Sequence, residues 1–165
     1  MINDVDGDGK IATVLSEFDG IFIVEKEQGF NTILEVDIQA QKNRPSALVN
    51  TIERKYPFVV SNGKNNYYSG STSGVFIEFD YDACQFKVKE GWQYREQFME
   101  FLQNGNPKIL KHDDGRMWLV TIVDNPSESA SEHPDKVITS FNWAETGDCN
   151  SGSDLYNNNF IDVDQ

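Results

Sequence analysis

Apolar and polar residues alternate along most of the chain, which is the pattern of half-buried β-strands. Two runs rich in β-branched and aromatic residues read "GIFIVEK" and "FNTILEVDIQA", and the short "EQG" between them predicts a hairpin. A second hairpin is predicted in "YPFVVSNGKNNYYSGSTSGVFIEFDYD", because Asn62-Gly63 supplies the positive φ of a type I′ turn. We expect extended structure in "PSALVNTIERKY" as well.

One segment has helical periodicity instead. Its apolar residues recur at i, i+4, i+7 and i+8, and they are Tyr94, Phe98, Phe101 and Leu102. Gly105 favours a left-handed helix stop, and Pro107 prevents the helix from continuing. These signals predict a helix over about residues 92–104, with Trp92 buried at its start.

Two apolar runs flank Asp114-Gly115, which is the strongest hairpin signal in the chain. The second run is apolar on both faces, so it is either a central strand or a strand covered by a neighbouring subunit. A sandwich has one interior between its sheets. We therefore predict a subunit interface that involves Trp118, Val120 and Ile122.

The last run, "KVITSFNWAETGD", places Val137, Thr139, Phe141 and Trp143 on one face, and the segment before it, residues 125–135, is a loop by composition. In total, about eight or nine strands and one helix are expected. The predicted fold is mainly β, an antiparallel β-sandwich or partly open β-barrel with one packed α-helix at about 92–104.

Length and charge add to this picture. A chain of 165 residues predicts a single domain over 1–165. Its net charge of −13 is concentrated at the ends, which predicts an acidic N-terminal segment (1–19) and an acidic C-terminal tail (148–165) flanking the core. The nearly balanced middle disfavours nucleic acid and membranes as partners, and favours another protein or a metal ion.

The sequence predicts neither a membrane-spanning segment nor a secretory leader, because its N-terminus is acidic and its apolar runs are short. Cys84 and Cys149 lack CxxC spacing, so we expect two free thiols in a reducing compartment.

Residues able to perform catalysis do not form a recognisable constellation. His112 and His133 each adjoin a predicted turn without an orienting partner nearby in sequence. Glu78, Asp80 and Asp82 alternate along one strand face, where solvent-facing charges are commoner than a glycosidase carboxylate pair. The sequence therefore favours a protein that is not an enzyme.

The aromatic residues leave a binding function open. Trp92, Trp118 and Trp143, with Tyr67 and Tyr68, suit either a sugar-stacking platform or core and interface anchors.

The stretch "DVDGDGKIATVL" matches the first half of an EF-hand loop, with Asp4, Asp6 and Asp8 at the first three ligand positions. Its twelfth position is Leu15 rather than a bidentate acid. Two alternatives stay open. One is a tight turn leading into a strand; the other is a Ca²⁺ site completed by acids from elsewhere, such as Glu17, Asp162 or Asp164.

A helix ending in "FLxxGxPKIL", a hairpin "DGRxWLV" and a strand "TSFNWAETGD" follow one another within residues 55–148, after the "YPFVVSNGKNNYYSG" hairpin. This order resembles the small β-barrel, distal-tail-like domains of tail-tip and baseplate proteins. Such proteins occur in tailed bacteriophages, prophages and phage-tail-like bacteriocins, especially those of Gram-positive hosts.

The resemblance implies a non-enzymatic structural component that forms a homo-oligomeric ring and contacts other phage tail or baseplate proteins. It also implies synthesis in the host bacterial cytoplasm and a final location in the virion tail. A carbohydrate-binding β-sandwich module and a calcium-binding cohesion module remain the alternatives.

Overall fold

The computed structural model describes residues 2–5, 11–14, 19–61, 63–80, 82–130, 133 and 135–161, with side chains described from residue 19 onward. These residues form thirteen strands, two α-helices and one short 3-10 helix. The expected mainly β, antiparallel fold with one substantial packed helix is confirmed. The number of strands exceeds the eight or nine expected.

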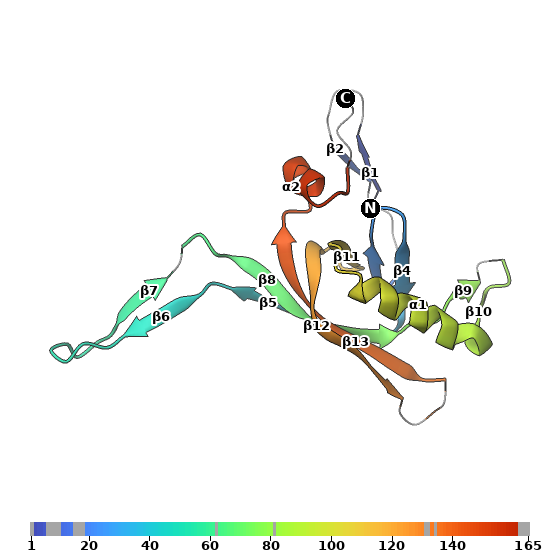
Figure 1. Cartoon of the computed structure of the whole chain (residues 1–165), viewed down its shortest axis with the longest axis horizontal. Helices are drawn as coiled ribbons and strands as arrows, with labels where there is room; N and C mark the ends of the chain where they lie inside the picture. Colours follow the sequence, from blue (N-terminus) through green and yellow to red (C-terminus); the bar gives the residue numbers. More distant parts are fainter. Residues whose placement is uncertain are drawn as a thin grey trace.

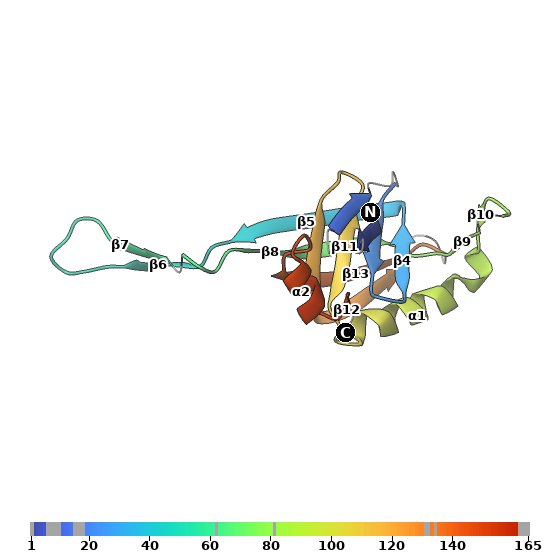
Figure 2. The same ribbon diagram turned by 90° about the horizontal axis from the view of Figure 1, so that it is seen from above.

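Seven antiparallel strands form the central sheet (Figures 1 and 2). In spatial order they are β4 (Gly29–Thr32), β3 (Ile21–Val24), β11 (Lys108–His112), β12 (Met117–Ala130), β13 (Val137–Gly147), β8 (Tyr67–Val75) and β5 (Leu34–Asn43). The other strands form three two-stranded sheets, which are β1 (Ile2–Val5) with β2 (Ile11–Val14), β6 (Ser46–Val49) with β7 (Phe58–Ser61), and β9 (Phe79–Asp80) with β10 (Gln85–Phe86).

Helix α1 (Gly91–Gln103) follows the 3-10 helix η1 (Val88–Glu90) and packs on one face of the sheet. Its predicted apolar stripe is confirmed, since Phe98, Phe101 and Leu102 are all buried. Gly105 has the left-handed φ of +78° that ends the helix, as expected. The prediction of a buried Trp92 is wrong, because this side chain lies away from the stripe and is 58% exposed.

The main core lies between α1 and the sheet. The Phe98 ring stacks on Phe76 with centroids 3.9 Å apart, and Phe30 lies 5.1 Å from Phe98. Trp143 is fully buried, and its indole Nε1 donates a hydrogen bond of 2.9 Å to Thr72 Oγ1. The predicted inward face of β13 is confirmed, because every second residue from Val137 to Trp143 is buried.

A smaller core lies on the opposite face of the sheet, under helix α2 (Gly152–Asn157). Here Leu155 packs with Ile109, Leu119 and Cys149. The expected acidic tail at 148–165 therefore contains a helix that covers the sheet. As a result, the chain itself covers one apolar face of β12 and, around Leu119, part of the other, while Val123 stays exposed.

The hairpins predicted for β3 with β4 and for β11 with β12 are confirmed, and Gly115 has a φ of +91° in the second turn. The loop predicted at 125–135 is wrong in its first half, because β12 continues to Ala130 and pairs there with β13. A shift in the β12–β13 register between Val123 and Ser127 lets the strand continue past Asp124, which has a φ of +61°.

The hairpin predicted at Asn62-Gly63 is also wrong. β7 pairs with β6 rather than with β8, and β8 pairs with β5 and β13. The chain reverses between β6 and β7, and the run at Ser46–Val49 is a more apolar partner for β7 than β8, which is rich in Ser and Gly. β5, β6, β7 and β8 consequently form one long hairpin that leaves the central sheet (Figure 1).

Candidate assembly surface

The outer part of this hairpin, residues 44–66, projects from the body of the molecule and is called the arm below (Figures 1 and 2). Every described residue of the arm is exposed, whereas β5 and β8 at its base are half-buried in the sheet. A two-stranded hairpin without a covering layer is marginally stable in water. The arm therefore has no second layer of structure packed on it.

The arm carries large apolar side chains on both faces of its ribbon. Seven of them are at least 44% exposed, and these are Leu48, Val49, Ile52, Tyr56, Phe58, Val59 and Val60. The β6–β7 register places Leu48 opposite Val59 on one face and Val49 opposite Phe58 on the other. Contiguous exposed apolar surface of this kind marks protein interaction sites.

The arm is also the basic part of an acidic chain. It holds Arg44, Arg54, Lys55 and Lys64 against Glu53, a formal charge of +3; the remaining ten bases and twenty-six acids give −16. The Arg54 guanidinium lies 4.3 Å from the centroid of the Phe58 ring, and Lys55 Nζ lies 5.4 Å from that of Tyr56. Cation and aromatic face are thus presented together.

The residues predicted for a subunit interface lie elsewhere. Trp118 and Val120 are 4% and 0% exposed within the chain itself, where they contact the main core. Ile122 is half-buried against the same core. These side chains need no second subunit to cover them, because they pack in the main core under α1. An oligomer formed through another surface stays a prediction.

The predicted calcium ligands are only partly within the described residues. Asp4 belongs to β1, with its side chain outside the description, and Asp6 and Asp8 lie outside the described residues altogether. In the described part of the chain, no group of three or more His, Cys, Asp or Glu side chains is placed to hold a metal ion.

The strand carboxylates have local partners. Glu78 Oε1 lies 2.9 Å from Lys87 Nζ, and Asp80 Oδ1 accepts hydrogen bonds from the backbone N–H groups of Asp82 and Ala83. Asp80 therefore stabilises the turn between β9 and β10, and Glu78 forms an exposed ion pair.

The two histidines lie at turns, as predicted. His112 ends β11, where its Nδ1 is 3.0 Å from a carboxylate oxygen of Asp113 and of Asp114. Hydrogen bonds from Arg116 and His112 lower the pKa of Asp114 against an opposing effect of desolvation. This cluster fixes the β11–β12 turn.

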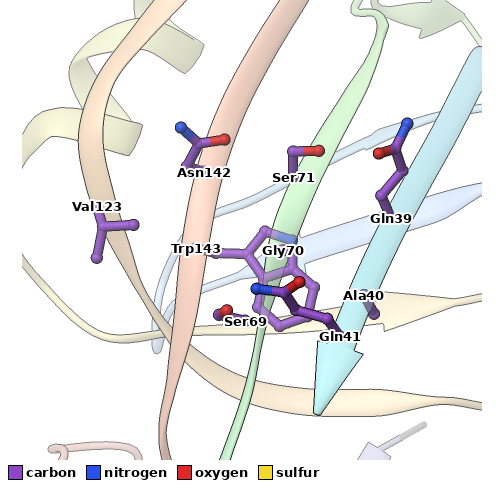
Figure 3. Close-up of a pocket in the computed structure, with 9 residues that line it drawn as sticks. All are labelled: Gln39, Ala40, Gln41, Ser69, Gly70, Ser71, Val123, Asn142 and Trp143. Atoms are coloured by element: carbon purple, nitrogen blue, oxygen red, sulfur yellow. The ribbon is translucent and has the colours of Figure 1, made fainter. Parts of the chain in front are cut away.

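The tryptophans do not form a sugar-stacking platform. Trp118 and Trp143 are both buried, with centroids 5.1 Å apart, while Trp92 stands on α1. The sheet does form a shallow groove of about 550 Å³ over β5, β8, β12 and β13 (Figure 3). Its polar lining consists of Gln39, Gln41, Ser69, Ser71 and Asn142, and Gly70 forms part of its floor.

The structural role of Lys108 could not be predicted from periodicity alone. Its side chain is fully buried, and its Nζ lies 2.7 Å from Glu25 Oε1, 2.8 Å from Asn104 Oδ1 and 2.9 Å from the Asn106 carbonyl. Burial lowers the pKa of Lys108, and Glu25 opposes this effect. Lys108 thereby ties the end of α1 to the β3–β4 hairpin. It lies within the "FLxxGxPKIL" segment that carries the family resemblance.

Both cysteines are free thiols, as expected; Cys84 is exposed and Cys149 is buried. Burial raises the pKa of the Cys149 thiol. Neither helix in the described part of the chain is long and apolar enough to cross a membrane.

No protein-family model matches the sequence, and no curated protein matches it. Among solved structures, the chain is similar to a chain of the virion of a native gene transfer agent particle, at 16% identity and a TM-score of 0.42, over 78% of this chain and 92% of that one. It is also similar to a chain of the tail of an empty gene transfer agent particle with C6 symmetry, at 17% identity and a TM-score of 0.42, over 82% and 96%. At this level of similarity, neither structure identifies the function of this chain.

Proposed function

We propose that the chain is a non-enzymatic structural subunit of a phage tail tip or baseplate, or of a tail-like particle, and that it assembles into a ring through protein–protein contacts. The observation that carries this proposal is the arm, which exposes seven large apolar side chains on a ribbon without a second layer. Such a surface is stabilised when another protein covers it.

Two further features support the proposal. The elements within residues 55–148 follow the order that resembles distal-tail-like domains, and helix α1 and the β11–β12 hairpin in that segment form where expected. The body of the molecule has a core on each face of β12, under α1 and under α2, and both are formed by this chain alone. The arm is then free to serve assembly rather than folding.

The test is the presence of the protein in purified particles. Tail-like particles are isolated from cells that express the chain from its native locus, and their proteins are identified by mass spectrometry. We expect the wild-type chain in the particles. Phe58→Asp combined with Val60→Asp should abolish incorporation, because both substitutions place charge on one apolar face of the arm.

Asn65→Asp with Asn66→Asp is the matched control, since it adds the same charge to exposed positions of the arm without removing apolar surface. This control should be incorporated normally. If the wild-type chain were missing from particles that assemble in the same cells, the proposed function would be wrong.

A carbohydrate-binding module is the second candidate, and the groove of amide and hydroxyl side chains in Figure 3 is the observation that favours it. Binding of the intact chain to a glycan array, lost on Gln39→Ala with Asn142→Ala and unaffected by the arm substitutions, would support this candidate over a structural role.

A further inference from the structure

The arm has a chemically complementary surface on the same molecule, at the start of α1. Val88 and Trp92 are 43% and 58% exposed there, and they form apolar surface outside both cores. Glu96 and Glu100 follow Trp92 at intervals of four residues, which places all three on one side of the helix. This surface, here called the α1 patch, is apolar and acidic where the arm is apolar and basic.

Few other charges face this side of the helix. Arg95 is mostly buried, with its Nε 3.8 Å from Glu128, so its charge is directed toward β12. Lys89 lies in η1 and is exposed, and Glu90 beside it offsets its charge. The α1 patch is therefore left with the negative charge of Glu96 and Glu100.

On the arm, three cationic side chains form no ion pair with other described residues of the chain and could pair with a partner. None of the ion pairs found among the described side chains involves Arg44, Arg54 or Lys55. Arg54 lies over the Phe58 ring, so a partner that covers Phe58 also meets this guanidinium. Both the arm and the α1 patch thus join an exposed aromatic ring to unpaired charge, with opposite signs.

The two surfaces cannot meet within one chain. The arm extends from one end of the molecule, whereas α1 begins beside β9 and β10 at the other end (Figures 1 and 2). A contact between them must join two copies, and each copy then still has one free arm or one free patch. Contacts of this head-to-tail kind continue until they close into a ring or form a filament.

We infer that the arm of one copy docks on the α1 patch of a second copy, with Phe58 and Arg54 against Trp92 and Glu96. This inference rests on the proposed structural function and names the partner of the arm. Opposite charges steer the two copies into one register, because the like-charged pairings of arm with arm and patch with patch are disfavoured.

The test is self-association of the intact chain, followed by sedimentation velocity and by acrylamide quenching of tryptophan fluorescence. Trp92 is the exposed tryptophan, since Trp118 and Trp143 are buried, so quenching reports on the α1 patch. We expect association at about 50 mM salt and weaker association at about 500 mM, where charges are screened over a few ångströms. Quenching should fall as the copies associate.

Charge reversal identifies the contact. Arg54→Glu with Lys55→Glu, and separately Glu96→Lys with Glu100→Lys, should each weaken association at least about tenfold. A mixture of the two variants should associate again, because the unchanged arm then meets the unchanged patch, and the reversed arm meets a reversed patch of opposite charge. Glu27→Lys with Asp37→Lys is the control for net charge, because both residues are exposed and lie outside the arm and the α1 patch, and it should leave the contact intact.

Three results would overturn the inference. They are a chain that stays monomeric at low salt, association that leaves Trp92 open to acrylamide, and a control that weakens association as strongly as the Glu96 and Glu100 reversals. Incorporation of the wild-type chain into particles alongside any of these would retain the proposed function, with a different protein as the partner of the arm. Absence from particles would reject the proposed function separately.

Discussion

At the scale of single residues, Lys108 is a fully buried lysine held by several partners. Its ammonium group is removed from water yet has three oxygen partners and the face of Phe101, 4.6 Å from its Nζ to the ring centroid. Buried charges are stable only when their partners are all present, because desolvation otherwise exceeds the attraction. The Lys108–Glu25 pair is therefore sensitive to the loss of either member.

Glu25→Gln should lower the free energy of unfolding by about 3 kcal/mol, because it leaves the buried ammonium without its counter-charge. Urea unfolding at pH 7 measures this change. The loss should shrink as the pH rises toward 10.5, since a lysine with a lowered pKa in the folded state is destabilising while protonated and stops being so when the proton leaves.

Glu25→Gln combined with Lys108→Met should be more stable than Glu25→Gln alone, because the buried charge is gone. Equal stability of the single and double variants would show that an unpaired buried ammonium group is not what destabilises Glu25→Gln.

At the scale of elements, strands and helices with strong patterns were predictable and those stabilised by tertiary contacts were not. The alternation of β13 and the stripe of α1 follow directly from side-chain periodicity. The Asn62-Gly63 signal failed because turn chemistry is local, whereas β7 is placed by its pairing with β6. The exposure of the arm was not predictable for a related reason, because an apolar strand is normally expected to be buried.

Helix α2 has a capping signal in its sequence, within a tail whose acidic composition by itself predicts no helix. Ser151 caps it, with the backbone N–H of Asp154 donating to Ser151 Oγ at 3.3 Å, and Asn159 ends it with a φ of +63°. A helix of six residues is marginal by propensity alone. Burial of Leu155 on the sheet supplies the remaining stabilisation.

Leu155→Ala should therefore lower the free energy of unfolding by about 2–5 kcal/mol, the usual range for a buried leucine. Tyr156→Ala is the matched control, because its side chain is half exposed and should change stability by about 0.5 kcal/mol or less. Chemical denaturation measures both. Equal effects of the two substitutions would contradict the packing of α2 on β11 and β12.

At the scale of the whole molecule, stability is distributed unevenly. Helix α1 covers one face of the sheet and α2 covers part of the other around Leu119, while every described residue of the arm is exposed. Local opening is easiest where few apolar contacts and exposed backbone hydrogen bonds coincide. The arm and the body should thus behave as separate units in a single chain.

Hydrogen exchange of the isolated chain tests this division. Amides of β6 and β7 should exchange by local opening and so far faster than those of Met117–Val123, which lie mid-sheet and should require near-global unfolding. In assembled particles the arm amides should become protected. Arm protection in the monomer equal to that of β12 would show that the arm is stabilised without a partner.

The sheet order also has a consequence for synthesis. The central strands β11, β12 and β13 come from the last third of the chain, whereas their outer neighbours β3 and β8 come from the first half. Ile21 pairs with His112, and Gly74 with Thr139, so strands that leave the ribosome early must wait for partners made much later. Such distant pairings fold slowly and leave strand edges exposed meanwhile. During translation the nascent chain therefore exposes its apolar arm and its unpaired strands at the same time. We expect the chain to be most prone to aggregation at this stage.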